Sequence, residues 1–301
     1  AMGFFGRKRA PSVPHPRKEP RFDGPLTLER LEQIFQDCVD FTKRPVSLGE
    51  GGACTLTLCY LSGMVKMERV SDYVLRPLAQ DEALARCGTP RQAMDRMKDG
   101  ALYNLSAEER TRLDAAVFDL VNGCCLLLFP GESSVLSLNV GTEEKRSISS
   151  PSNETVLKGS RDAFVESLRT NTSIVRRHLK APELRIREQV VGRQSVTSVD
   201  ILYIEGLTNP HLVEQVAAQL ADIDIDAVLA TGNIEEYIVP AARTAFPLVQ
   251  YTERSDRFCA GLAEGRVGIL IDGLPLGYLA PGVLGDFLQA PQDKSESWLL
   301  A

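Results

Sequence analysis

The chain repeats one arrangement of strands and glycines at an almost constant distance, and this repeat limits the possible folds. Four pairs of landmarks are separated by 142 or 143 residues: Tyr60 and Tyr203, Gly63 and Gly206, Gly123 and Gly265, and Gly131 and Gly273. Self-similarity at a fixed distance indicates two copies of one structural unit. The sequence therefore predicts an α/β fold of two tandem related subdomains, each a small mixed sheet flanked by helices.

In the first copy, glycine, proline and capping signals divide the chain into elements. A strand-like run at 56–61 ends at Gly63. Thr89 and Pro90 predict the start of a short helix that ends at Gly100. The run 106–109, Ser-Ala-Glu-Glu, has the form of a capping box and predicts a helix that ends at Gly123. A hairpin with its turn at Pro130-Gly131 follows.

The second copy shows the same order of signals. Asn209 and Pro210 predict a helix to about Ala221, and Asn233 is expected to cap another. The run 252–256 is interpreted as a helix start. Asp272-Gly273 between apolar runs is typical of a hairpin turn.

The acidic run 222–226 alternates Asp with Ile and superficially resembles a calcium loop. Ala227 and Asn233 occupy the positions where such a loop needs Gly and its bidentate Glu. Alternation places the Asp residues on one face and the Ile residues on the other, which favours a half-buried strand.

The stretch 161–179 is predicted to form an amphipathic helix with an unusual middle. Its apolar residues recur at helical spacing: Phe164, Leu168, Val175 and Leu179. The central run 169–173 is made mostly of weak helix formers and loses roughly 2 kcal/mol of local preference relative to Ala. We expect hydrogen bonds from these side chains to a partner element as compensation. The alternative is an ordinary solvated polar face.

Composition and charge suggest how the chain is organised. We predict a flexible basic tail at 1–25, a first subdomain at 26–140, a linker at 141–158, a second subdomain at 159–290 and a tail at 291–301 that leads to a membrane domain in the full-length protein. Residues 1–25 carry a net charge of +4, whereas the whole chain carries −6. The acidic remainder argues against a nucleic-acid partner. The basic tail is interpreted as solvated, with weak attraction to an anionic membrane as the alternative.

The sequence contains no arrangement that predicts catalysis. Its three histidines are scattered, and seven cysteines lack a Cys-x-x-Cys pair, which fits reduced thiols in the cytosol. We therefore predict no enzyme activity, no catalytic residues, no cofactor and no metal. No apolar run approaches 18 residues, so no segment of this sequence is predicted to span a bilayer.

The second half of the chain resembles one known family. The string Leu168-Arg169-Thr170-Asn171-Thr172, preceded by Gly159, Arg161, Phe164 and Glu166, begins six ordered blocks. The blocks are 159–172, 209–210, 223–226, 231–236, 252–256 and 264–275. Over roughly residues 158–289 they are similar to the GerA family, the A subunits of spore germinant receptors. The stage V sporulation protein AF, a close relative, shares these blocks.

This resemblance implies a role in nutrient-triggered spore germination. The chain would be the soluble N-terminal region of a receptor A subunit, on the cytoplasmic (spore core) side of the inner spore membrane. Its implied partners are B-type and C-type receptor subunits, its own membrane domain and further copies of itself. The region would act as a scaffold for subunit assembly and signal coupling.

We predict that the coupling surface lies on and near the helix at 161–179. The candidate residues are Arg161, Glu166, Arg169, Thr170, Asn171, Glu253, Arg254, Arg266 and Asp272. An alternative hypothesis is a small-molecule binding module that holds a germinant in a cleft between the two copies.

Overall fold

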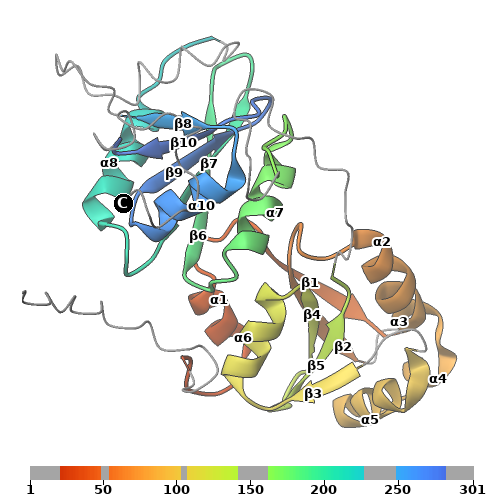
Figure 1. Cartoon of the computed structure of the whole chain (residues 1–301). Helices are drawn as coiled ribbons and strands as arrows, with labels where there is room; N and C mark the ends of the chain where they lie inside the picture. Colours follow the sequence, from red (N-terminus) through yellow and green to blue (C-terminus); the bar gives the residue numbers. More distant parts are fainter. Residues whose placement is uncertain (1–20, 49–53, 103–106, 142–161, 227–248, 283–301) are drawn as a thin grey trace, which may run out of the picture.

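Two five-stranded sheets with the same strand order form the framework of the protein (Figure 1). The computed structural model describes residues 21–48, 54–102, 107–141, 162–226 and 249–282. Within these ranges the first sheet has the order β1-β2-β4-β5-β3 and the second the order β6-β7-β9-β10-β8. Strand for strand, the second order repeats the first, so the two tandem subdomains share one topology.

The described elements are given in chain order for each subdomain. In the first they are α1 (Leu28–Ile34), β1 (Phe41–Ser47), β2 (Thr55–Leu61), α2 (Met67–Arg69), a π-helical segment (Val70–Leu75), α3 (Arg76–Gln80), α4 (Glu82–Ala85), α5 (Pro90–Arg96), a second π-helical segment (Met97–Ala101), β3 (Ala107–Arg110), α6 (Leu113–Val121), β4 (Cys124–Leu128) and β5 (Val135–Asn139). In the second they are α7 (Leu168–His178), β6 (Leu184–Val191), β7 (Thr197–Ile204), α8 (Pro210–Ala221), β8 (Gln250–Thr252), α10 (Ser255–Ala263), β9 (Val267–Ile271) and β10 (Gly277–Ala280).

Helices cover both faces of each sheet, so the central strands are apolar on both sides. Successive strand residues point to opposite faces. Leu58 accordingly joins the core under α2 to α5, and Cys59 joins the core under α1 and α6. In the second sheet Ile201 faces α8, whereas Leu202 faces α7 and α10. This double burial explains why β4 and β9 are continuous apolar runs.

The landmark glycines confirm the repeat. All six have left-handed backbone, and repeat partners have nearly equal φ angles: +79° for both Gly63 and Gly206, +87° and +88° for Gly123 and Gly265, and +79° and +84° for Gly131 and Gly273. These conformations favour glycine because it lacks a Cβ atom. Each pair ends a strand, ends a helix or turns a hairpin in both copies.

The sheets differ in one respect from the predicted mixed sheets. Every described strand pair is antiparallel. Tight hairpin turns require this direction, because a parallel neighbour needs a long crossover. The prediction of mixed sheets was wrong because the strands of each copy were located without their pairing partners.

The predicted helix start at 106–109 is also wrong. Ala107–Arg110 forms the edge strand β3, and α6 begins only at Leu113. The Glu109 carboxylate, which the capping box would use, instead accepts hydrogen bonds from Arg91 at 2.7 Å and Lys98 at 2.6 Å. These tertiary partners outweigh the local capping signal.

The run at 222–226 keeps its predicted alternation but forms no strand. Ile223 is buried between exposed aspartates. The carbonyls of Ile225 and Asp226 accept hydrogen bonds from the backbone N–H groups of Arg193 and Gln194 at 2.9 and 2.8 Å. The segment therefore binds the β6–β7 turn rather than a sheet edge.

Other predictions for the second copy are confirmed or fall outside the described ranges. Helix α8 ends at Ala221 as predicted, and the Asn209 side chain accepts from the N–H of His211 at 3.0 Å. The cap predicted at Asn233 and the tail at 291–301 lie outside the described residues. So does nearly all of the linker predicted at 141–158, and the domain limits stay a prediction.

Gly63 offers a test of the packing between the two copies. A Cβ atom at Gly63 would lie 1.9 Å from Ser173 Oγ, whereas one at its repeat partner Gly206 would meet nothing within 4 Å. Both residues have φ +79°, so backbone strain is matched. We expect Gly206→Ala to lower the free energy of unfolding by about 1 to 2 kcal/mol and Gly63→Ala by about 1 to 3 kcal/mol more. If urea denaturation showed the same loss of unfolding free energy for both variants, close packing of α7 on Gly63 would be contradicted.

Candidate functional site: the polar junction around helix α7

Helix α7 begins later than predicted. The predicted helix over 161–179 starts only at Leu168, and residues 162–167 precede it without helical structure. Ala163 forms a β-bridge with Arg254, and the N–H of Phe164 donates to the carbonyl of Glu253 at 2.8 Å. Phe164 packs edge-on against Phe258 of α10 rather than lying on a helix face. Strand-like pairing of this segment excludes it from the helix.

Tertiary contacts support the first turn of α7. Ser167 occupies the N-cap position but makes no side-chain cap bond. Asp272, in the β9–β10 turn, instead accepts from the N–H of Leu168 at 3.1 Å through Oδ1. The side-chain amide of Asn171 forms two hydrogen bonds with the backbone of Val165. It accepts from the N–H at 2.8 Å and donates to the carbonyl. The start of this helix thus depends on a residue more than a hundred positions away.

The weak helix formers in α7 have hydrogen-bond partners, as predicted. Thr172 Oγ1 lies 2.9 Å from the Leu168 carbonyl and 3.0 Å from Oδ2 of Asp200 in β7. Ser173 Oγ donates to the Arg169 carbonyl at 2.7 Å. Only part of the compensation is therefore tertiary, since Ser173 bonds within the helix itself.

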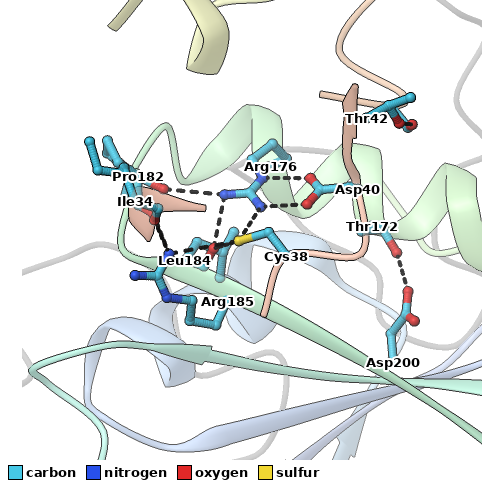
Figure 2. A network of polar contacts seen from close by, with 12 residues as sticks. Ile34, Cys38, Asp40, Thr42, Thr172, Arg176, Pro182, Leu184, Arg185 and Asp200 are labelled. Carbon is cyan, nitrogen blue, oxygen red and sulfur yellow. Dashed lines mark hydrogen bonds and ion pairs between the residues drawn. The ribbon is translucent and has the colours of Figure 1, made fainter. Parts of the chain in front are cut away.

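A buried ion pair joins α7 to the first subdomain (Figure 2). Arg176 Nε and Nη2 donate to the two carboxylate oxygens of Asp40, each at 3.0 Å. The side chains are only 1% and 3% exposed. Arg176 Nη1 also donates to the carbonyls of Leu184 at 3.1 Å and Ala181 at 3.3 Å. Burial, the largest single cause, lowers the pKa of Arg176, but the charges of and hydrogen bonds to Asp40 and Cys38 together outweigh it, so that pKa is raised.

Backbone pairing continues the contact beside this ion pair. The N–H of Val39 donates to the carbonyl of Ile186 at 2.9 Å, and the N–H of Ile186 donates to the carbonyl of Asp37 at 3.0 Å. The segment before β1 therefore covers the outer edge of β6, which would otherwise be unpaired. Arg185 donates to the carbonyls of Ile34 and Pro182 over the same edge (Figure 2).

Asp200 is a second buried carboxylate in this region. It is fully buried on β7, directly opposite Glu188 of β6. Arg169 bridges the two carboxylates, donating to Glu188 at 2.7 Å and to Asp200 at 3.2 Å. Burial, the largest cause, raises the pKa of Asp200 to about 6, although Arg169 and Thr172 act in the opposite direction.

We define the α7 junction as the residues that connect α7 to the first subdomain and to β6 and β7. They are Cys38, Asp40, Arg169, Thr172, Ser173, Arg176, Arg185 and Asp200. Figure 1 shows α7 and β6 where the two subdomains meet. Every ionised group of the junction has an opposite charge or a carbonyl beside it, so the arrangement is suited to holding two units in one orientation.

The structure gathers most of the predicted site residues around the start of α7. Glu166, Arg169, Thr170, Asn171 and Asp272 lie there, and Glu166 accepts from the N–H of Gly273 at 2.8 Å through its carbonyl. Glu253 and Arg254 are next to them through the pairing with 163–164.

Two predicted site residues stand apart from this group. Arg266 lies just before β9, at the end of the strand opposite Asp272, and contacts Gln250 and Glu264 instead. Arg161 lies outside the described residues.

The prediction missed the most buried members of the junction. Arg176 follows Leu168 and Thr172 at intervals of eight and four residues, so a helical wheel places it on the buried face. Asp200 interrupts an apolar strand. Both signals were available in the sequence. Asp40 offered none, because its partner lies 136 residues away.

A groove of about 480 Å³ lies beside the junction, between α6 and residues 180–182. Its lining combines charged and apolar side chains: Arg21, Arg110, Asp114, Asp119 and Lys180, with Val117, Phe118, Val121 and Pro182. Lys180 donates to Oδ1 of Asn122, the residue after α6, at 3.0 Å. The groove lies where both subdomains contribute residues.

Three further observations concern the described part of the chain. None of its helices combines the length and hydropathy needed to cross a membrane. In the same ranges no three His, Cys, Asp or Glu side chains are grouped to hold a metal ion. The seven cysteines are free, and burial raises the pKa of Cys59 and Cys259 to about 12, which leaves these thiols poorly reactive.

The fold has a counterpart among solved structures. It is similar to the crystal structure of the N-terminal domain of the A subunit of the Bacillus megaterium spore germinant receptor GerK3, with a TM-score of 0.67 and 27% sequence identity. The match covers 85% of this chain and 94% of that chain. The tandem α/β architecture is therefore that of a germinant receptor A-subunit N-terminal domain.

The chain belongs to the GerA family, as the sequence resemblance predicted. A family model described as Bacillus/Clostridium GerA spore germination protein matches residues 29–301, so the match includes the first subdomain as well. Among relatives from Bacillus subtilis (strain 168), the uncharacterized membrane protein YfkQ is 32% identical over 91% of this chain and 52% of its own length.

Two further relatives from the same organism are spore proteins. Spore germination protein KA is 32% identical over 84% of this chain and 46% of its own length. Stage V sporulation protein AF is 30% identical, with corresponding shares of 79% and 48%. The chain spans about half the length of the curated relatives it matches.

The buried ion pair predicts a large and specific effect on stability. Asp40→Asn leaves the Arg176 guanidinium buried without its counter-charge, and we expect the free energy of unfolding to fall by about 3 to 5 kcal/mol in urea denaturation. The exposed i,i+4 pair between Arg86 and Glu82 is the control, and Glu82→Gln should change stability by less than about 0.5 kcal/mol. The double variant Asp40→Asn with Arg176→Met should recover part of the loss. If Asp40→Asn behaves like Glu82→Gln, the pair does not hold the junction.

Proposed function

We propose that this chain is the N-terminal domain of a spore germinant receptor A subunit and acts as an assembly and signal-coupling scaffold. The family and the fold support the first part. The α7 junction supports the second, because it joins the subdomains through a fully paired buried ion pair. A unit held this way transmits a displacement at one surface to the other as a rigid body.

The surroundings of the scaffold follow from the relatives and are likewise proposals. In the full-length protein we place this region on the cytoplasmic side of the inner spore membrane, next to its own membrane domain. B-type and C-type receptor subunits and further copies of the A subunit would contact it. We propose a binding role without catalysis, since the relatives are known as germination proteins rather than enzymes.

The exposed end of the junction is the part that a partner subunit can reach. The Arg169 side chain is 49% exposed and bridges Glu188 and Asp200. Thr170, the next residue, bonds only Ser167 Oγ at 3.1 Å among the contacts of its hydroxyl in the described residues. These side chains sit on α7, which belongs to the second subdomain and contacts the first, so a partner bound there would act on the junction directly.

Arg169 therefore provides a test of coupling. In spores that carry the full-length protein, Arg169→Ala should raise the nutrient concentration for half-maximal germination by about 5- to 100-fold, the usual range of a coupling free energy. Receptor levels in the spore membrane, measured by immunoblot, should stay unchanged.

Arg193→Ala is the matched control, because Arg193 is 70% exposed and pairs with Asp224 away from the junction. A normal nutrient response with Arg169→Ala, at normal receptor levels, would contradict a coupling role for this surface.

A second candidate function is germinant binding, and the groove between α6 and 180–182 favours it. Paired charges and an apolar wall suit a small zwitterionic or polar molecule. Calorimetry with amino acids, sugars and nucleosides should then give saturable heat that Lys180→Ala abolishes and Lys43→Ala, remote from the groove, leaves unchanged. If none of the three classes of compound gave measurable heat, binding in this region would be contradicted, and the scaffold proposal would be unaffected.

A further inference from the structure

One hydroxyl of the α7 junction is close to two acceptors at once. Thr172 Oγ1 lies 2.9 Å from the carbonyl oxygen of Leu168 and 3.0 Å from Oδ2 of Asp200. A threonine hydroxyl carries a single hydrogen and can donate to only one of them. If Asp200 is ionised, two acceptors compete for this hydrogen, and one contact is then between two oxygens without a proton.

The other carboxylate oxygen of Asp200, Oδ1, has its hydrogen-bonding capacity unsatisfied within the described ranges. Among the residues that the structure describes, Oδ1 is buried and has no hydrogen-bond partner. Asp200 lies two residues before Leu202 on β7, so it shares the sheet face whose core includes Leu202 and Phe258. A buried carboxylate oxygen without a donor carries the full cost of its lost hydration.

A proton on Asp200 resolves both conflicts. We propose that Asp200 is a proton-binding site, whose bound proton completes a hydrogen-bond chain from β7 to α7. In this chain Asp200 Oδ2–H donates to Thr172 Oγ1, and the Thr172 hydroxyl donates to the Leu168 carbonyl. The carboxyl is then neutral, and the cost of burying Oδ1 falls to that of a neutral oxygen.

Charges from three elements surround this site. Arg169 of α7 favours the ionised form, whereas Glu188 of β6, opposite in register, and Asp40 before β1 favour the protonated form. Leu270 of β9, the other register partner, is apolar. When Asp200 is neutral, Arg169 keeps its shorter contact with Glu188 at 2.7 Å. The proton comes from solvent, which reaches the half-exposed Arg169 side chain next to the carboxyl.

Release of the proton changes what α7 contacts. The Thr172 hydroxyl turns to Asp200, its bond to the first turn of the helix is lost, and Arg169 is shared between two carboxylates. The fold binds this proton more tightly than the unfolded chain, because the pKa of Asp200 is raised from 3.8 to about 6. The resulting stabilisation is fully present below about pH 4 and is lost as the pH rises through about 6.

Carbon-13 NMR of the aspartate carboxyl groups tests the site directly in the whole chain. The Asp200 signal, assigned by its absence in Asp200→Asn, should titrate with a midpoint near pH 6. Glu188→Gln removes the opposing like charge and should move that midpoint to lower pH. Glu214→Gln alters an exposed carboxylate paired with Arg187 and should leave it unchanged. A midpoint below pH 4 in the wild-type chain would overturn the proposal.

Stability gives a second, independent readout. Between pH 4.5 and 7 the wild-type unfolding constant should rise by on the order of 10- to 100-fold from this site. Asp200→Asn imitates the protonated carboxyl and should remove that rise, whereas Glu214→Gln should retain it. Equal pH dependence in the wild type and Asp200→Asn would also refute the site.

This inference does not depend on the proposed function. An Asp200 titration midpoint below pH 4 would eliminate the proton site but would leave the scaffold role unaffected. Conversely, a normal germination response with Arg169→Ala would contradict the coupling role, whereas the proton site at Asp200 would still hold.

Discussion

The bidentate pair between Arg176 and Asp40 is the interaction on which the arrangement of the two subdomains depends. Two charges removed from water are tolerated only when geometry is good and the remaining donors are also satisfied. Arg176 meets this condition, because the Leu184 and Ala181 carbonyls take its third nitrogen. The ion pair lies beside the backbone pairing of 37–39 with β6, so charge and main chain fix the same contact. Directional bonds of this kind specify orientation more sharply than apolar contact alone.

The repeat makes clear why α7 is polar on its buried side. At the repeat offset of 143 residues, the counterpart of Arg176 is Gln33 of α1, which is exposed. Helix α1 has one sheet to cover and does so with apolar residues such as Leu31 and Ile34. Helix α7 covers its own sheet and also contacts the other subdomain. The same position of the same unit is therefore solvated in one copy and buried in the other.

Much of the fold was predictable because its signals are local. Left-handed glycines, the Asn209 cap and the Asp272-Gly273 turn act over a few residues, and each appears where it was expected. The failures have a common cause. The run 106–109 carries a capping signal of about 1 kcal/mol, and the pairing of Ala107–Arg110 with β5 outweighs that preference. Residues 163 and 164 likewise pair with Arg254 and Glu253 instead of joining the helix. The candidate site shows the same division, since Asn171 and Asp272 were identified from the family blocks whereas Asp40 required a contact distant in sequence.

By itself, the sequence determined that this protein is built from two copies of one α/β unit and that it belongs to the GerA family. It also determined that the middle of the 161–179 stretch needs partners, because its residues are weak helix formers. Only the tertiary structure decided where α7 begins, which carboxylate meets Arg176 and which one lies against Thr172. The physical reason is that these choices depend on burial and on pairs of groups separated by 28 to 136 residues. No local pattern encodes the distance between such groups.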